Sequence, residues 1–146
     1  MIRNASLRAA KAEDLEAVRQ VLAVSGLSIP ESSDATALYH VAIVDDRVVG
    51  CACGEQLSET FVVHTVAVLP GYRGHRLATH LVSVLLTRAR ANGCTKATVL
   101  TDENPSFFAR YGFSLTPTDT VVREMQLSME FLRRFGARSH YMCRQL

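Results

Sequence analysis

The chain has 146 residues, of which 48% are hydrophobic and 21% charged, and its formal net charge is +2. This length matches one compact domain, and we expect residues 1–146 to form it. The mild charge, without a long run of Lys or Arg, argues against a nucleic-acid partner. No signal-peptide pattern and no stretch of roughly 20 apolar residues occurs. We therefore expect a cytoplasmic protein without a membrane partner.

The four cysteines do not suggest a metal site. Cys51 and Cys53 form a C-x-C pair inside an apolar run, which on a strand directs both thiols to the same side. No second pair with zinc-ligand spacing follows, so neither Cys94 nor Cys143 completes a set. We expect no metal and interpret the cysteines as small buried side chains in a reducing compartment.

The N-terminal third predicts a strand, a helix and a less regular segment. The strand is expected at Ser6–Ala10, and the helix starts near Asp14 and stops at Gly26. Ile29–Ala37 carries Pro, Ser and Asp and is interpreted as a loop or a poorly formed helix. The predicted helix has apolar residues at helical spacing: Leu15, Val18, Val21 and Leu22.

The middle of the chain predicts an antiparallel meander followed by a helix. Tyr39–Val44, Val48–Gln56 and Thr60–Leu69 are rich in Val, Thr and Phe, and short polar turns separate them. A helix is expected to start near Gly74 and to end at the Asn-Gly pair that begins with Asn92.

The C-terminal third completes a mixed α/β (α+β) pattern in which helices pack on one sheet. The elements expected here alternate between strands and helices. They are a strand at Lys96–Thr101, a short helix at Pro105–Arg110, a strand stub at Phe113–Leu115, a helix at Val121–Phe135 and a last strand at Ser139–Gln145.

The junction at Val66–Ala78 is the most informative segment. An apolar strand stops at Pro70, and a turn containing Gly74 leads directly into an amphipathic helix. The first amides of a helix have no internal partner and lie at the positive end of its dipole, so they bind anions. Gly74 lets a phosphate approach the backbone, and nearby cationic side chains favour it further. Those side chains are Arg73, His75 and Arg76.

The string V-A-V-x-P-x-x-R-G-x-x-L-A, beginning at Val66, resembles the cofactor motif of the GNAT superfamily of N-acetyltransferases. The resemblance implies a mostly antiparallel sheet of six or seven strands with splayed middle strands, about four flanking helices, and acetyl-CoA as co-substrate. It implies that the backbone of Val66, Ala67 and Val68 pairs with the pantetheine arm. It places the pyrophosphate among Arg73, Gly74, His75, Arg76, Leu77 and Ala78. Arg76 stands where many relatives have a second glycine.

The resemblance also suggests a proton acceptor. Many relatives have a Glu two residues before the first Val of the motif, and this chain has His64 there. The usual pKa of a histidine lies near neutrality, which suits removal of a proton from an ammonium group. A half-buried strand histidine without a chemical role is the alternative interpretation, and Glu55 and Glu59 are competing bases.

The usual proton donor of the family is missing. Many relatives have a Tyr four residues before the Gly of a Gly-Phe pair, and here that position is Phe108. Tyr111 takes the role, or a water does, or the thiolate leaves unassisted. We expect Phe108 to border the thioester. Thr101 stands where relatives often have an Asn.

The resulting hypothesis is an N-acetyltransferase for a small primary amine, such as an amino acid or a toxic analogue. A weaker resemblance links the F-F-A-R-Y-G-F string, beginning at Phe107, to amino-acid N-acetyltransferases and to relatives associated with arsenic resistance. The alternatives are acetylation of a protein lysine or N-terminus, and a non-catalytic acyl-CoA binding or sensing module. The sequence leaves a homodimer open.

Overall fold

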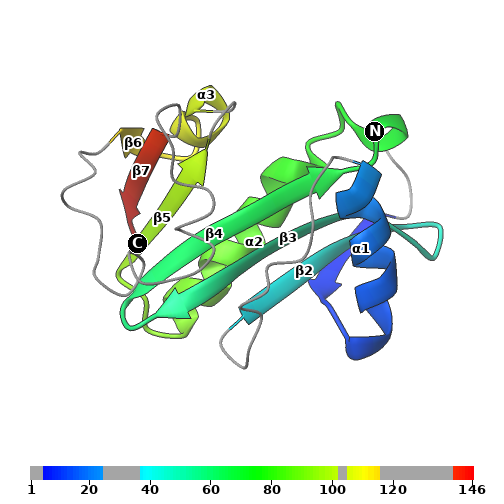
Figure 1. Ribbon diagram of the computed structural model, residues 1–146, viewed down its shortest axis with the longest axis horizontal. Helices are drawn as coiled ribbons and strands as arrows, with labels where there is room; N and C mark the ends of the chain where they lie inside the picture. The colour runs from blue at the N-terminus through cyan, green and yellow to red at the C-terminus, as the bar shows by residue number, and fades with distance from the viewer. Residues whose placement is uncertain (1–4, 25–36, 102–104, 116–139) are drawn as a thin grey trace.

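The computed structural model describes residues 5–24, 37–101, 105–115 and 140–146, and these form one mixed sheet with helices on both faces (Figure 1). The sheet has seven strands in the order β1-β2-β3-β4-β5-β7-β6. Every neighbouring pair is antiparallel except β4 and β5. The strands are β1 (Ala5–Ala9), β2 (Ala37–Val44), β3 (Arg47–Leu57), β4 (Thr60–Val68), β5 (Lys96–Thr101), β6 (Ser114–Leu115) and β7 (His140–Gln145).

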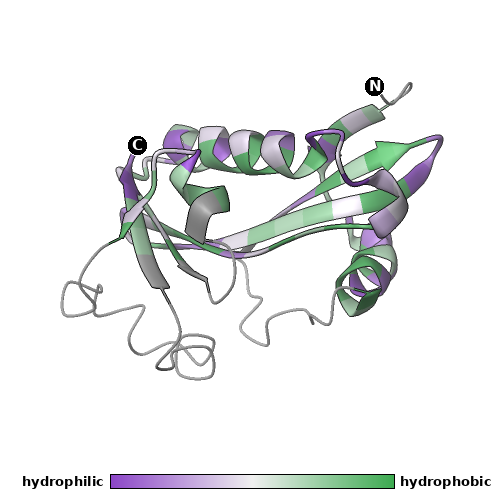
Figure 2. Cartoon of the chain, turned by 90° about the horizontal axis from the view of Figure 1, so that it is seen from above, coloured by the Kyte–Doolittle hydropathy of each residue, from purple (hydrophilic) through white to green (hydrophobic). Residues whose placement is uncertain are grey.

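The described helices lie on opposite faces of this sheet. Figure 2 shows α2 (Leu77–Ala91) above the sheet and α1 (Leu15–Val24) beneath it. The larger core lies on the α2 face, where Leu81 and Leu85 are fully buried against Phe61 and Val63. A smaller cluster packs α1 onto the other face: Val18, Val21, Leu22, Val41, Cys51 and Ala67. Alternation of side chains along the strands supplies both cores.

An ion pair fixes the start of α1 to β1. Arg8 Nη1 and Nη2 donate to Asp14 Oδ2 and Oδ1 at 2.6 and 3.1 Å, and the Lys11 amide donates to Asp14 Oδ2 at 2.7 Å. These bonds, the one from Arg8 first, lower the pKa of Asp14 to about 2. A short 3-10 turn, η1 (Ala12–Asp14), therefore precedes α1.

The predicted elements are confirmed within one to three residues wherever the structure describes them. The largest difference is the start of α2, which begins at Leu77 rather than near Gly74. Gly74 and Arg76 have positive φ values of 84° and 63°, and this left-handed backbone cannot continue a right-handed helix. α3 (Pro105–Ala109) ends one residue before the prediction. The stop at Gly26, nearly all of 29–37 and the helix at 121–135 lie outside the described residues.

The middle strands β4 and β5 diverge halfway along β4. Their parallel pairing runs from Thr60↔Lys96 to Val63↔Val99 and ends there, although β4 continues to Val68. On its other edge β4 has an irregularity at the same level: Cys53 pairs with Thr65, but Gly54 pairs with Val63. His64 is thus an extra residue in β4, a β-bulge that bends the strand. The expected splaying of the middle strands is confirmed.

The bulge requires Gly54. A Cβ atom at this position would lie 2.5 Å from two ring carbons of Phe61 and 2.6 Å from the Val62 carbonyl oxygen. Contacts this short force backbone or side chains to move. The absence of a side chain at Gly54 therefore lets β3 follow β4 through its bend.

The cysteines contribute packing in this fold. Cys51, Cys53 and Cys94 are buried, whereas Cys143 is partly exposed, so the expectation of burial is wrong for that one. Burial, with a smaller effect of Cys53, raises the pKa of Cys51 to about 12 and keeps it a neutral thiol. Within the described ranges, no cluster of three or more His, Cys, Asp or Glu residues could hold a metal ion. No helix there is both long and apolar enough to cross a bilayer.

Candidate functional site

The edge of β4 that faces the divergence carries backbone groups aimed away from β3. The Leu69 amide donates a 2.8 Å hydrogen bond to the Val49 carbonyl. In an antiparallel pair, this bond determines which residues of β4 direct their backbone groups toward β3. Ala67, two residues earlier and opposite Cys51, therefore also directs its polar groups to β3. Val66 and Val68 direct theirs to the other side, where no described strand pairs with them. Of the three predicted residues, only these two face the open edge.

The loop after β4 is tied back to the strand by Arg73. Its Nε donates a 2.9 Å hydrogen bond to the Val68 carbonyl, and a short 3-10 turn, η2 (Pro70–Tyr72), precedes it. A Cβ atom at Gly74 would meet no atom within 4 Å. The predicted cofactor loop thus has open space above Gly74, as an approaching phosphate requires.

The start of α2 leaves amide donors without helical partners. The first amide bonded back within the helix is that of His80, which donates to the Arg76 carbonyl at 3.0 Å. The amides of Leu77, Ala78 and Thr79 precede it, and no side chain of the described residues caps this end. Arg76 itself adopts the left-handed conformation at the N-cap, the conformation that glycine adopts without strain.

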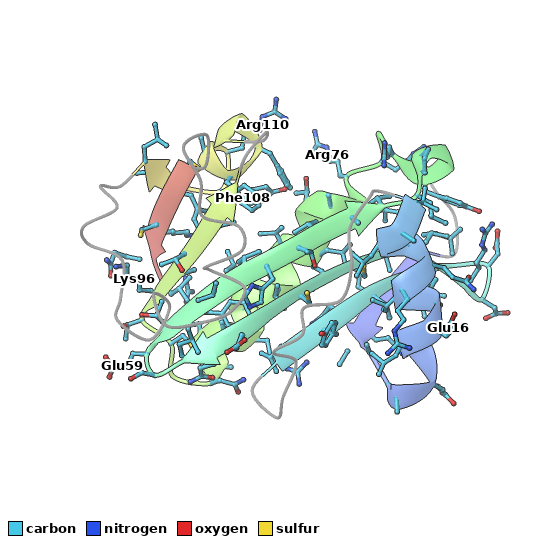
Figure 3. The ribbon with its side chains drawn as sticks, in the orientation of Figure 1. Glu16, Glu59, Arg76, Lys96, Phe108 and Arg110 are labelled. Atoms are coloured by element: carbon cyan, nitrogen blue, oxygen red, sulfur yellow. The ribbon has the colours of Figure 1, made fainter. Side chains whose placement is uncertain are left out.

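Positive charge gathers at this end of the molecule. Figure 3 shows Arg76 and Arg110 at the end where β4 runs toward α2, with Glu59 at the opposite end of β4. Arg73, His75, Arg76 and Arg110 are all exposed. The predicted loop residues therefore lie together as expected, and Arg110, which the sequence did not single out, joins them. A basic residue two positions before Gly112 of the Gly-Phe pair is the sequence feature that could have pointed to it.

His64, at the bulge, is paired with Glu55 of β3. His64 Nε2 lies 3.4 Å from Glu55 Oε2, and each side chain is only 9% exposed. Register explains the contact: Glu55 pairs with Val62, so His64 is its diagonal neighbour on the same face. On that face Cys53 Sγ also lies 2.8 Å from Thr65 Oγ1. Two residues predicted as competing bases thus form one pair.

Glu59, the remaining candidate base, and two further histidines lie outside this pair. Glu59 is exposed in the turn between β3 and β4, far from Arg76 (Figure 3). His80 is exposed on α2. His40 is buried, and the burial together with the charge of Arg88 lowers its pKa and keeps it neutral.

The aromatic residues of α3 and the following turn form a compact set. Phe108 is buried in the α2-side core, with its ring edge-on to Phe107 and Phe113 at 5.0 and 5.7 Å. Tyr111 lies in the turn after α3, not in a helix, and its ring contacts Phe107 at 5.2 Å. Arg144 of β7 holds this turn by donating from Nη1 to the Tyr111 carbonyl at 2.8 Å.

Comparison with known proteins identifies the family of this chain. The family model described as acetyltransferase (GNAT) family matches residues 7–113, which is most of the chain. The chain belongs to the GNAT acetyltransferase family. The match includes β4, the cofactor loop, α2 and the turn that holds Tyr111. A comparison with curated proteins gave no significant match.

Several solved structures share the fold. N-acetylglutamate synthase from Neisseria gonorrhoeae, complexed with coenzyme A and N-acetyl-glutamate, is 18% identical with a TM-score of 0.82; the match covers 100% of this chain but 36% of that one. Rv2747 from Mycobacterium tuberculosis, in complex with CoA and NLQ, is 27% identical with a TM-score of 0.78, covering 97% and 99%. The ribosomal-protein-S18-alanine N-acetyltransferase from Escherichia coli is 14% identical with a TM-score of 0.74, covering 97% and 93%.

Proposed function

We propose that this protein is an N-acetyltransferase that moves an acetyl group from acetyl-CoA to the primary amine of a small molecule. The observation that carries the proposal is the junction of β4 and α2. There, an edge of β4 with which no described strand pairs leads directly to a helix start that no described side chain caps, and exposed basic side chains lie in the loop between them. Acetyl-CoA combines the complementary groups: two amides in its pantetheine arm and a negatively charged pyrophosphate.

In this proposal the cofactor extends the sheet at β4. The pantetheine amides pair with the backbone of Val66 and Val68, as an added strand does. The pyrophosphate accepts hydrogen bonds from the first amides of α2, beginning at Leu77, and Gly74 lets it approach the loop. Arg73, His75 and Arg76 supply positive charge, and Ala78 provides a small side chain on the first turn. Phe108 borders the thioester end.

The proposed chemistry is direct transfer in a ternary complex. The amine nitrogen attacks the thioester carbonyl carbon, a C–N bond forms, and the C–S bond breaks to give an amide and the CoA thiolate. His64 accepts the proton that the amine loses, and the Tyr111 hydroxyl protonates the thiolate. Both residues then exchange protons with water, so the net products are an N-acetylated amine and free CoA.

An amino acid or a close analogue is the proposed acceptor class. Of the structures with this fold, one is complexed with coenzyme A and N-acetyl-glutamate and another with CoA and NLQ. The buried Glu55–His64 pair adds a compact polar site on the sheet face where α1 packs. These features favour a small acceptor over a protein chain.

Calorimetry with acetyl-CoA, followed by release of free thiol with a panel of amines, tests the proposal. We expect binding, and turnover with at least one amino acid or analogue. Turnover only with peptides would replace the small acceptor by a protein, and binding without turnover would indicate a sensing module. Absence of binding would refute the assignment. His64→Ala should lower kcat more than it raises KM for acetyl-CoA, and Tyr111→Phe should lower kcat.

A further inference from the structure

The Glu55–His64 pair has the geometry of a histidine held by a carboxylate. The two side chains come from adjacent strands, they lie 3.4 Å apart between Oε2 and Nε2, and each is 9% exposed. A carboxylate at pH 7 accepts hydrogen bonds and donates none. Nε2 is therefore the nitrogen that carries the proton in this contact, and neutral His64 has its lone pair on Nδ1.

We propose that Glu55 is a positioning residue that fixes the tautomer of His64 and stabilises its protonated form. When Nδ1 takes a proton from the amine, the ring becomes an imidazolium whose Nε2–H still points at the Glu55 carboxylate. Glu55 itself gains no proton. Burial strengthens the effect, because an ion pair that is little exposed is weakly screened by solvent. The inference rests on the proposed function in giving His64 the role of proton acceptor.

The position of the pair in the fold gives this role a location. His64 is the bulged residue and the first residue of β4 beyond its pairing with β5. It therefore lies where the proposed pantetheine strand would end at its thioester. Glu55 is on β3, one strand further from the divergence, and contacts His64 through Nε2. Glu59, the carboxylate used below as a control, lies in the exposed turn between β3 and β4 and not beside the bulge.

Few other charged groups of the described residues face His64. On β3 the titratable neighbour besides Glu55 on this face is the thiol of Cys53, which contacts Thr65, and on β2 it is Tyr39, which pairs with Cys53. On β5, Lys96 pairs with Thr60, four residues away along β4. α1 presents apolar side chains to this face, and α2, with His80 and Arg88, packs on the opposite face. Among the described residues, Glu55 is thus the carboxylate that contacts His64.

The kinetic test compares the pH dependence of acetyl transfer in the wild type, Glu55→Gln, Glu55→Asp and the matched control Glu59→Gln. The acid limb that disappears in His64→Gln belongs to His64. We expect Glu55→Gln to move that limb to lower pH and to lower the plateau kcat about 10- to 100-fold, with KM for acetyl-CoA unchanged. Glu55→Asp should restore part of both, and Glu59→Gln should match the wild type. An unmoved limb in Glu55→Gln would overturn the inference.

A second readout does not need activity. ¹⁵N NMR of the imidazole rings, with His64 assigned through His64→Gln, reports the tautomer. We expect Nε2–H in the wild type and in Glu55→Gln, whose amide oxygen still accepts, and a mixture of tautomers in Glu55→Ala. An Nδ1–H tautomer in the wild type would overturn the inference. If the wild type neither binds nor consumes acetyl-CoA, the proposed function fails, but the spectra still decide the role of Glu55.

Discussion

Arg73 Nε donates a 2.9 Å hydrogen bond to the carbonyl of Val68, so the first basic residue of the proposed cofactor loop is anchored on the last residue of β4. One lone pair of that carbonyl is occupied, and the other remains for a ligand. The contact holds the loop against the strand edge that the proposed pantetheine arm follows. Arg73 therefore shapes the site as well as adding charge to it.

Arg73→Ala should weaken acetyl-CoA binding about 10- to 100-fold, because the loop is then no longer held against the strand edge. A hydrogen bond from a charged group contributes about 1.5–3 kcal/mol to holding such a geometry. Arg73→Lys keeps the charge but lacks the Nε–H, and we expect it to bind nearly as weakly. Arg90→Ala, which removes an exposed charge near the other end of α2, is the control and should bind normally. Calorimetry measures all three. Full affinity in Arg73→Lys would reduce Arg73 to a source of charge.

Gly74 and Gly71 form a matched pair for testing the loop. A Cβ atom would meet nothing within 4 Å at either position, but only Gly74 has a positive φ, 84°. Gly74→Glu should reduce acetyl-CoA affinity by more than about 100-fold, because it strains the backbone and faces the pyrophosphate with a carboxylate. Gly71→Glu adds the same charge and should cost less. Equal losses of affinity in isothermal titration would mean that Gly74 lies no closer to the bound pyrophosphate than Gly71 does.

Arg76 offers a test of backbone strain. A non-glycine residue in the left-handed region costs about 1–2 kcal/mol, whereas glycine adds about 0.4–1 kcal/mol of unfolded-state entropy. Arg76→Gly should therefore be about 0.5–1 kcal/mol more stable than Arg76→Ala, which lacks the same guanidinium but keeps the strain. Urea unfolding of the two variants gives the difference. An Arg76→Ala variant as stable as Arg76→Gly would contradict the strained geometry.

Asp14 makes stability depend on acid. Its pKa is lowered to about 2 in the folded protein, from 3.8 ordinarily, so its ion pair contributes fully above about pH 4. That contribution is lost as the pH falls through about 2. Asp14→Asn should be less stable than the wild type at pH 6, by about 1 kcal/mol because Arg8 is partly exposed, and the two should converge near pH 2. Unfolding curves with a constant difference between pH 6 and 2 would exclude the ion pair as the cause.

Gly54→Ala should destabilise the protein by about 1–3 kcal/mol or more, because its Cβ would overlap the Phe61 ring and the Val62 carbonyl. The same substitution at Gly71, where a Cβ has space, should change stability by less than about 1 kcal/mol. Thermal unfolding compares them. A tolerated alanine at position 54 would show that β3 can move away from the bulge at little cost.

Local patterns were enough to predict the strands and the loop after β4, because alternation in the meander and the turn at Pro70 are short-range signals. The start of α2 was placed near Gly74, since nothing in the sequence reveals that Arg76 is left-handed. The bulge at His64 also has no local signal: V-V-H-T-V alternates equally well without it. The Glu55–His64 contact was within reach, because pairing Leu57 with Thr60 across the turn makes the two residues diagonal neighbours. The Arg73–Val68 bond depends on loop geometry that residue types do not encode.

The short parallel pairing of β4 with β5 has a mechanical consequence. In the described sheet, the pairing from Thr60↔Lys96 to Val63↔Val99 is the one strand pairing that joins β1–β4 to the three strands β5, β7 and β6. A pantetheine chain bound beside Val66 and Val68 would add a second connection between these two groups of strands, present only while the cofactor is bound. Loading the protein would then stiffen β7 together with the loop, and slower amide hydrogen exchange in that distant strand would report occupancy.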